Sequence, residues 1–319
     1  MTSLGRIAAR VSDAALEASI VGSFTRAGFE ARSKLNSWKQ PPQMSGQTAL
    51  ITGGTTGIGR ATALGLMALG ADVIITSRSK DRADSTAAEF NEEASTGSAR
   101  GLAVDTGDHD SVRELIDAVK ASTDHLDVLI NNAGALTNSY NADAAGTELT
   151  LSSHLIGPYI LTLGLKDHMA DGGRILWMSS GGMYTQGLDV ETIELSAASY
   201  KGAIAYAKAK RGQVELVTHL APRWAPGIIM HSMHPGWVDT PGVDAGLPGF
   251  GKVMGPTLRT AEQGADTMVW LAASGGNDAK PGSFFHDRSP RSTSYIPGTG
   301  TTPGERQKLV NWLDKLVAA

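Results

Sequence analysis

The sequence predicts an α/β fold, a doubly wound and mainly parallel sheet of about seven strands with helices on both faces. Two observations support this prediction. From residue 48 onward, short apolar runs alternate with helical patterns, as in chains built from strand–helix–strand units. A glycine-rich turn also joins the first apolar run to the first helical pattern, which is the context of a nucleotide-binding turn.

Residues 1–42 precede this pattern and are expected to form a helical extension. Small apolar residues recur at helical spacing over residues 7–21, and aromatic residues lie among basic ones over residues 24–38. We expect the extension to pack on its own domain or on a neighbouring subunit. The alternative is peripheral contact of residues 1–40 with a membrane surface. We expect residues 43–319 to form a single dinucleotide-binding domain.

The remaining elements follow from periodicity and from the Gly and Pro residues that separate them. We expect strands at residues 48–52, 72–77, 99–104, 127–131, 173–179, 226–232 and 282–286. We expect helices near residues 57–70, 80–94, 109–121, 145–170, 200–222, 260–273 and 304–317. The Gly/Pro-rich stretch near 236–258 is predicted to be a substrate loop, and residues 287–303 an irregular surface segment.

Composition restricts the function. Hydrophobic residues make up 41% of the chain and charged residues 19%, as in soluble globular proteins. A net charge of −4 without a basic block gives no reason to expect nucleic acid as a partner. The absence of cysteine excludes disulfides, thiolate catalysis and Cys-zinc sites, and we expect no metal. No apolar run reaches the roughly 18–20 residues of a membrane span, so we expect a cytoplasmic or peripherally membrane-associated protein.

The turn after the first strand has the composition of a dinucleotide-binding site. It reads TGGTTGIG over residues 52–59. Gly53 can make the tight turn, Gly57 lets the backbone approach a pyrophosphate, and Gly59 lets helix and strand pack closely. The free amides of the following helix would face the phosphates. We therefore expect this turn to contact the cofactor through Gly53, Thr55, Thr56, Gly57, Ile58 and Gly59.

The second strand ends at Ser77-Arg78, where an adenosine ribose would lie. An acidic residue there would bind the 2′-hydroxyl of NAD, whereas a guanidinium can bind a 2′-phosphate with paired hydrogen bonds. NADP(H) is therefore the predicted cofactor and NAD(H) the alternative. Further contacts are expected after the next two strands, from Asp105, Thr106, Asn132, Ala133 and Gly134.

Tyr206 and Lys210 are the predicted catalytic pair, because residues four apart share one face of a helix. A nearby ammonium is expected to lower the pKa of the phenol, which could then exchange a proton with an alcohol or carbonyl oxygen. The strand ending near residue 179 supplies a hydroxyl for the same oxygen. We assign Ser180 to this role, with Ser179 as the alternative.

These motifs resemble those of the short-chain dehydrogenase/reductases, from about residue 46 to the end of the last helix. The resemblance rests on TGGTTGIG at 52–59, NNAG at 131–134, Ser180, YAKAK at 206–210 and HPGWVDT at 234–240. The stretches MSSGGM, YAKAKRGQVELV, EQGADTMVWLA and FFHDR resemble most closely the member-12 subgroup, near the retinol dehydrogenases.

The resemblance implies an NAD(P) hydride carrier and assigns roles to individual residues. Tyr206 becomes the acid/base, and Lys210 modifies its pKa and contacts the nicotinamide ribose. Ser180 binds the substrate oxygen, while Pro235, Gly236 and Thr240 lie beside the nicotinamide. Homo-oligomers formed through the two long helices near residues 145–170 and 200–222 are also expected from the family.

One position departs from the family pattern. Where the family places a catalytic asparagine before Gly-x-aromatic, this chain has His154 in HLIGPY. A histidine can relay protons, or it can be a structural replacement that weakens the relay. Both alternatives stay open at this point.

The predicted function is an NADP(H)-dependent oxidoreductase that interconverts a small-molecule alcohol with its ketone or aldehyde. An apolar substrate is expected, because the substrate loop contributes Val243, Leu247, Phe250, Val253 and Met254 with little charge. The alternative is a catalytically weak dinucleotide-binding sensor or scaffold. His154 and the extension favour that alternative, whereas the presence of Tyr206, Lys210 and Ser180 together favours the enzyme.

Overall fold

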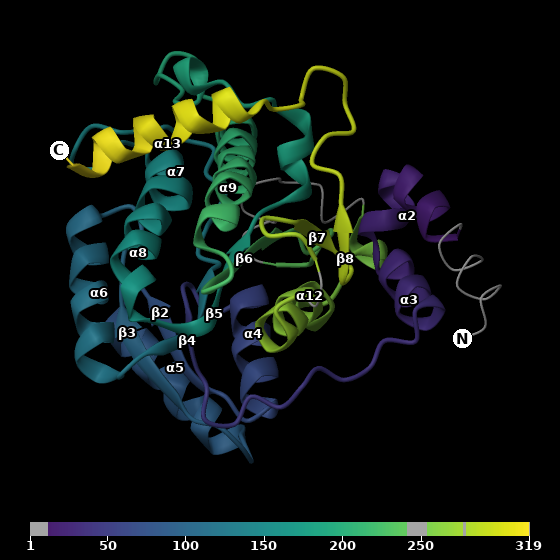
Figure 1. Ribbon diagram of the computed structural model, residues 1–319, viewed down its shortest axis with the longest axis vertical. Helices are drawn as coiled ribbons and strands as arrows, with labels where there is room; N and C mark the ends of the chain where they lie inside the picture. Colours follow the sequence, from purple (N-terminus) through teal and green to yellow (C-terminus); the bar gives the residue numbers. More distant parts are fainter. Residues whose placement is uncertain (1–11, 241–253, 277–278, 319) are drawn as a thin grey trace.

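The chain folds around one eight-stranded sheet in the order β3-β2-β1-β4-β5-β6-β7-β8 (Figure 1). The computed structural model describes residues 12–240, 254–276 and 279–318. Neighbouring strands from β3 to β7 pair in parallel, and only the last pair, β7 with β8, is antiparallel. The strands are β1 (Thr48–Ile51), β2 (Asp72–Ser77), β3 (Ala99–Ala103), β4 (Leu126–Asn131), β5 (Met169–Met178), β6 (Ile228–Met233), β7 (Phe284–His286) and β8 (Ser289–Arg291).

The strand order reverses direction between β1 and β4, which makes the fold doubly wound and Rossmann-type, as predicted. In such sheets the ligand crevice lies beyond the carboxyl ends of the strands at this reversal. The turns that follow β1, β4, β5 and β6 all end at this edge of the sheet. These turns contain many of the residues that the sequence assigned to the cofactor and the substrate, whereas Ser77-Arg78 and Asp105-Thr106 lie at the ends of β2 and β3.

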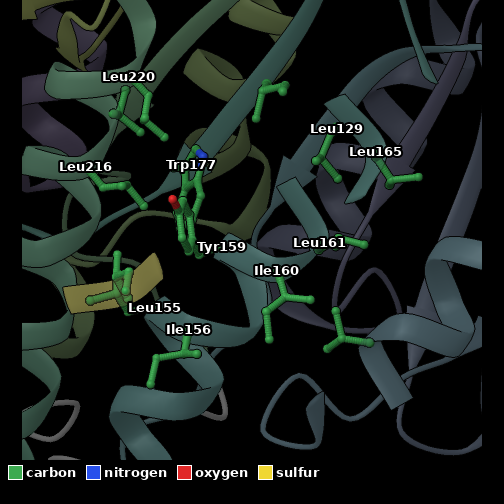
Figure 2. Packing of buried hydrophobic residues seen from close by; sticks show 14 of the residues in the cluster. Leu129, Leu155, Ile156, Tyr159, Ile160, Leu161, Leu165, Trp177, Leu216 and Leu220 are labelled. Carbon is green, nitrogen blue, oxygen red and sulfur yellow. The ribbon is translucent and has the colours of Figure 1, made fainter. Parts of the chain in front are cut away.

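Helices cover both faces of the sheet. One face carries α4 (Gly57–Ala68), α5 (Lys80–Glu93) and α12 (Ala261–Ser274). The other carries α6 (His109–Ser122), α8 (Gly157–Leu165) and α9 (Gly202–Trp224), with α13 (Pro303–Ala318) packed on α9. Figure 2 shows the second core from close by, with Tyr159 and Trp177 among leucines of α8 and α9. Burial of these apolar side chains on both faces stabilises the layers.

The helix expected at residues 145–170 is shorter and less regular than predicted. It begins as α7 (Leu149–Leu151), because the buried Glu148 carboxylate caps the amides of Thr150 and Leu151. A π turn, η1 (Ser152–Ile156), then leads into α8. After the 3-10 turn η2 (Lys166–His168) the chain enters β5, whose first residue, Met169, pairs with Leu126. Residues 169–170 therefore belong to the sheet, where pairing with β4 overrides helix propensity.

The segment 287–303 was predicted to be irregular, and this was wrong at its start. Asp287 and Arg288 adopt left-handed φ angles of 52° and 55° and form the turn that reverses β7 into β8. Left-handed conformations at both central residues are typical of tight hairpins but are usually made by Asn or Gly. Here Asp287 is held by buried ion pairs to Arg32 and Arg259, which local sequence does not reveal.

The N-terminal segment runs along the β7–β8 side of the sheet (Figure 1). Residues 12–18 are helical, followed by α2 (Ile20–Phe24) and α3 (Arg26–Leu35). Within the described ranges, no helix has the length and apolar character needed to cross a bilayer. Most of the predicted substrate loop, residues 241–253 with Val243, Leu247, Phe250 and Val253, lies outside the described residues. The C-terminal end of the predicted loop forms the short 3-10 turn η5 (Gly255–Thr257).

Candidate active site

The glycine turn after β1 is closed so tightly that Gly53 and Gly59 have little or no room for side chains. A Cβ on Gly59 would lie 2.2 Å from the carbonyl oxygen of Gly53, and one on Gly53 would lie 3.0 Å from Cα of Ala133. Gly53 and Gly57 have φ angles of +67° and +53°, which favour glycine. The helix α4 begins at Gly57, and its N-cap, Thr56, makes no side-chain capping bond. Its first amides are therefore available to a bound anion.

Thr52 joins this turn to the loop after β4. Its hydroxyl oxygen accepts hydrogen bonds from the backbone amides of Asn132 and Ala133, each at 3.0 Å. Asn132 in turn donates its side-chain amide to the Thr52 carbonyl at 2.8 Å. The sequence analysis did not single out Thr52 as a functional residue. Its position at the end of β1, directly before the first glycine of the turn, could have indicated a role in shaping the cofactor site.

The expected adenosine contacts lie at the ends of β2 and β3. Arg78 is exposed directly after β2. Asp105 is exposed after β3, and its carboxylate accepts the amide of Gly107 at 2.9 Å. Thr106 is buried, and its carbonyl lies 1.9 Å from where a Cβ on Gly157 would be. Thr106 therefore also fixes the position of α8.

Tyr206 and Lys210 lie on α9, with the Lys210 Nζ 5.4 Å from the centroid of the Tyr206 ring. Nζ donates to the carbonyl oxygen of Met178, at the end of β5, over 2.7 Å. Burial lowers the pKa of Lys210 to about 7. Burial also raises the pKa of Tyr206, and a hydrogen bond with Ser180 opposes this only in part. The expected lowering of the phenol pKa by Lys210 is thus not found in this structure, because desolvation dominates.

The two serines after β5 have different environments. Ser180 is partly exposed, lies near enough to the Tyr206 phenol to affect its pKa, and accepts the amide of Gly182 at 3.2 Å. Ser179 is buried and donates its hydroxyl to the carbonyl of Lys210 at 3.0 Å. Of the two, Ser180 is therefore the one beside the phenol, whereas Ser179 braces β5 against α9.

His154 lies in the π turn η1, packed against both Tyr206 and the loop after β4. Its ring meets that of Tyr206 at a centroid distance of 5.3 Å, and its Nε2 lies 2.6 Å from where a Cβ on Gly134 would be. Nδ1 donates to the carbonyl of Thr150 at 2.8 Å. The backbone carbonyl of His154 accepts the side-chain amide of Gln213 at 2.6 Å. The histidine is thus held in place by both its ring and its backbone.

The loop after β6 returns to the glycine turn. Gly236 has φ +80°, and a Cβ there would lie 2.5 Å from Nε of Arg259. At the other end of the loop, the Thr240 methyl group lies 3.5 Å from where a Cβ on Gly57 would be. Pro235 and Gly236 therefore lie on the side of β6, and Thr240 reaches the turn that would hold phosphates.

Residues 47–246 match the family described as short chain dehydrogenase. The chain belongs to the short-chain dehydrogenase/reductase family. Dehydrogenase/reductase SDR family member 12 of Homo sapiens is 37% identical over 304 residues, which are 92% of this chain and 93% of that protein. Retinol dehydrogenase 14 of Homo sapiens is 31% identical over 274 residues, 77% of this chain and 80% of the relative.

Among solved structures, a short chain dehydrogenase from Burkholderia cenocepacia in complex with NADP superposes with a TM-score of 0.61. It is 25% identical in sequence and covers 76% of this chain and 96% of its own. The family and the fold expected from the sequence are therefore confirmed, and this short-chain dehydrogenase/reductase is an oxidoreductase of the NAD(P)-using type.

The residues of this short-chain dehydrogenase/reductase fit a dinucleotide. The crowded glycines leave backbone rather than side chains at the turn, and the uncapped start of α4 leaves amides for a pyrophosphate. His154 Nε2 is a buried nitrogen without a hydrogen-bond partner in the described structure, and it faces the loop that carries Asn132 to Gly134. The sequence analysis missed Phe24 and Arg259, which pack on the Pro235-Gly236 loop from distant parts of the chain.

Proposed function

We propose that this enzyme is an NADP(H)-dependent oxidoreductase that interconverts a small, apolar alcohol with its ketone or aldehyde. The observation that carries the proposal is the convergence of Tyr206, Ser180 and Lys210 at the carboxyl end of β5, at the same edge of the sheet as the glycine turn after β1. A phenol and a hydroxyl that lie next to each other can together hold one substrate oxygen.

The glycine turn and the uncapped start of α4 would hold the pyrophosphate, with Arg78 on the 2′-phosphate and Asp105 near the adenine. Asn132, Ala133 and Gly134 would flank the middle of the dinucleotide, and Pro235, Gly236 and Thr240 its nicotinamide half. When bound, the dinucleotide supplies or accepts the hydride. The chemistry that remains for the protein is to orient the substrate and to transfer one proton.

Tyr206 transfers that proton in the proposed mechanism. Because burial raises its pKa, the phenol is protonated and is ready to donate to the oxygen of a carbonyl as that oxygen gains negative charge. Ser180 donates or accepts a hydrogen bond at the same oxygen and fixes its distance from the phenol. Lys210, held by the Met178 carbonyl, keeps a cationic or neutral amine beside the ring, depending on pH.

An apolar substrate is supported by the side chains near Ser180. A buried cluster of Phe24, Met183, Tyr184, Val214 and Phe284, with Trp237 packed against it, backs the loops that follow β5 and β6. Such surroundings favour apolar groups next to the reacting oxygen over charged ones.

The experiment is a titration of the pure protein with NADPH and with NADH, followed by nucleotide fluorescence. It is combined with NADPH oxidation assays on benzaldehyde, acetophenone, cyclohexanone and decanal. We expect tighter binding of NADPH and carbonyl-dependent oxidation with at least one probe. Tyr206→Phe should reduce that turnover by roughly 100-fold or more without changing NADPH affinity. Tyr159→Phe is the matched control, because that phenol hydrogen-bonds Asp314, between α8 and α13.

Each outcome has a separate meaning. Absence of binding by either nucleotide would refute the cofactor site and the catalytic assignment with it. Binding of NADPH without turnover on a widened carbonyl and alcohol panel would favour the catalytically weak sensor or scaffold. Equal losses of turnover in Tyr206→Phe and Tyr159→Phe would show that the effect is structural.

A further inference from the structure

Phe24, from the N-terminal segment, fills the space between the loops that follow β5 and β6. A Cβ on Gly181 would lie 2.7 Å from Cε2 of Phe24, so the ring packs directly on the residue after Ser180. On its other side the ring lies 4.5 Å from His234 and 5.9 Å from Trp237, measured between centroids. One side chain therefore touches both loops that flank the proposed substrate position.

The backbone of Phe24 is part of the same arrangement. Its carbonyl oxygen accepts the amide of Trp237 at 2.8 Å and Nε of Arg259 at 3.0 Å. Arg259 also donates to the carbonyl of Pro235 at 3.1 Å, and its own amide donates to the carbonyl of Trp237 at 2.8 Å. The residues that follow β6 are thus hydrogen-bonded on one side to the N-terminal segment and on another to Arg259.

A buried group of charges holds the N-terminal segment in this position. The Arg32 guanidinium, which is 0% exposed, pairs with Asp287 at 2.8 Å, Glu17 at 2.6 Å and Asp13 at 2.7 Å. Asp287 also pairs with Arg259 at 2.6 Å. Burial alone would raise the pKa of Asp287, but His286 and the two arginines hold it well below its ordinary value. The carboxylate is therefore charged, and it connects α3 to the residue that holds the loop.

Two cation–π contacts also attach the N-terminal segment to the rest of the protein. The Arg259 guanidinium also lies over the Phe29 ring at 5.4 Å, and the Arg288 guanidinium lies over Trp38 at 4.8 Å. Cation–π contacts of partly desolvated arginines are favourable and directional. The segment from residue 12 to residue 38 is thus attached at several points to Arg259 and to the turn between β7 and β8.

We propose that residues 12–38 are a positioning element of the active site, in which Phe24 and Arg32 hold the loops of Ser180–Gly181 and Pro235–Trp237 in place. The proposal rests on the proposed function for the identity of these loops. It assigns to the N-terminal segment an effect on the substrate and nicotinamide half of the site. It assigns none on the glycine turn, which follows β1 and meets the loop after β6 at Thr240, beyond the held residues Pro235–Trp237.

The first test is hydrogen exchange followed by mass spectrometry, which needs no substrate. Phe24→Leu and Arg32→Gln should speed exchange in peptides covering residues 234–240 by roughly tenfold, since hydrogen bonds such as that of the Trp237 amide are weakened. Peptides covering residues 50–60 should be unchanged. Lys34→Ala, on the exposed side of α3, is the control for Arg32→Gln. Phe90→Leu, a buried ring on α5, is the control for Phe24→Leu.

The second test is kinetic and separates substrate from cofactor. With acetophenone and benzophenone as probes, Phe24→Leu should change the ratio of kcat/KM between the two ketones by about tenfold. The Kd for NADPH should change by less than this ratio, because the glycine turn and Arg78 would still bind the phosphates of the dinucleotide. Phe90→Leu should leave the ratio unchanged.

Unchanged exchange at residues 234–240 in folded Phe24→Leu, or a change equal to that in Phe90→Leu, would overturn the proposal. If Arg32→Gln does not fold, Phe24→Leu alone decides. A wild-type protein that turns over no carbonyl would refute the proposed function, while the exchange result would still decide whether the segment holds the loop.

Discussion

His154 and Tyr206 meet edge to face in the candidate active site, with ring centroids 5.3 Å apart and an interplanar angle of 85°. Because Nδ1 of His154 donates to a carbonyl, Nε2 carries the lone pair, and this atom is buried without a hydrogen-bond partner in the described structure. Burial, followed by the nearby Lys210 charge, lowers the pKa of His154 to about 3. The imidazole is therefore neutral at physiological pH and presents an acceptor to the site.

We expect His154 to act in the site as a hydrogen-bond acceptor through Nε2, and not by gaining or losing a proton. His154→Phe, which keeps an aromatic ring but has no acceptor, should lower kcat by roughly tenfold or more, whereas His154→Asn should retain most activity. Because the pKa is about 3, the wild-type kcat profile between pH 5 and 9 should show no step from this histidine. Equal kcat in wild type and His154→Phe, with NADPH affinity preserved, would mean that the histidine is only structural.

Ser180→Ala and Ser179→Ala form a matched pair. Ser180→Ala should lower kcat/KM by about 100-fold, because it removes a group that contacts the reacting oxygen in the proposed mechanism. Ser179→Ala removes the buried hydrogen bond to the Lys210 carbonyl and should lower the free energy of unfolding by about 1 kcal/mol. Steady-state kinetics and urea unfolding distinguish the two. The reverse pattern would move the oxygen-binding role to Ser179.

Arg78→Asp should reverse the proposed nucleotide preference. We expect the Kd for NADPH to rise at least about tenfold, since a carboxylate repels a 2′-phosphate, while NADH binding is kept or improved. The measurement is a pair of fluorescence titrations at fixed ionic strength. Arg113→Asp is the control, because it makes the same change of charge at an exposed position of α6. A similar loss in both variants would assign the effect to the overall charge of the protein.

Lys210→Met should abolish turnover and yet stabilise the protein near neutral pH. The pKa of Lys210 is about 7 in the folded state and 10.5 ordinarily, so the unfolded state binds more protons between these values. The free energy of unfolding of the wild type therefore rises with pH over this window. The advantage of Lys210→Met should be about 3 kcal/mol at pH 7 and should shrink towards pH 10. Urea unfolding of both proteins at several pH values measures it, and an advantage that does not vary with pH would contradict the buried-lysine account.

Much of the architecture was determined by local sequence. The strands at residues 48–51 and 72–77 and the helices at 80–93 and 261–274 follow directly from apolar runs, caps and glycine positions. The motif TGGTTGIG predicted the turn, because its glycines are needed by backbone geometry that depends on few neighbours, and the alternation of strands and helices predicted the doubly wound fold. The family could be assigned for the same reason, since its motifs are short and contiguous.

The tertiary structure alone decided features that depend on desolvation and on contacts between distant residues. The spacing of Tyr206 and Lys210 predicts a lowered phenol pKa, but burial by the surrounding elements raises it. Nothing in the segment around Phe24 or Arg32 indicates that they meet Trp237, Arg259 and Asp287, which lie more than 200 residues away in the chain. Periodicity shows which face of a helix or strand is apolar. The element that packs against that face, and the low dielectric constant that burial produces there, exist only once the chain has folded.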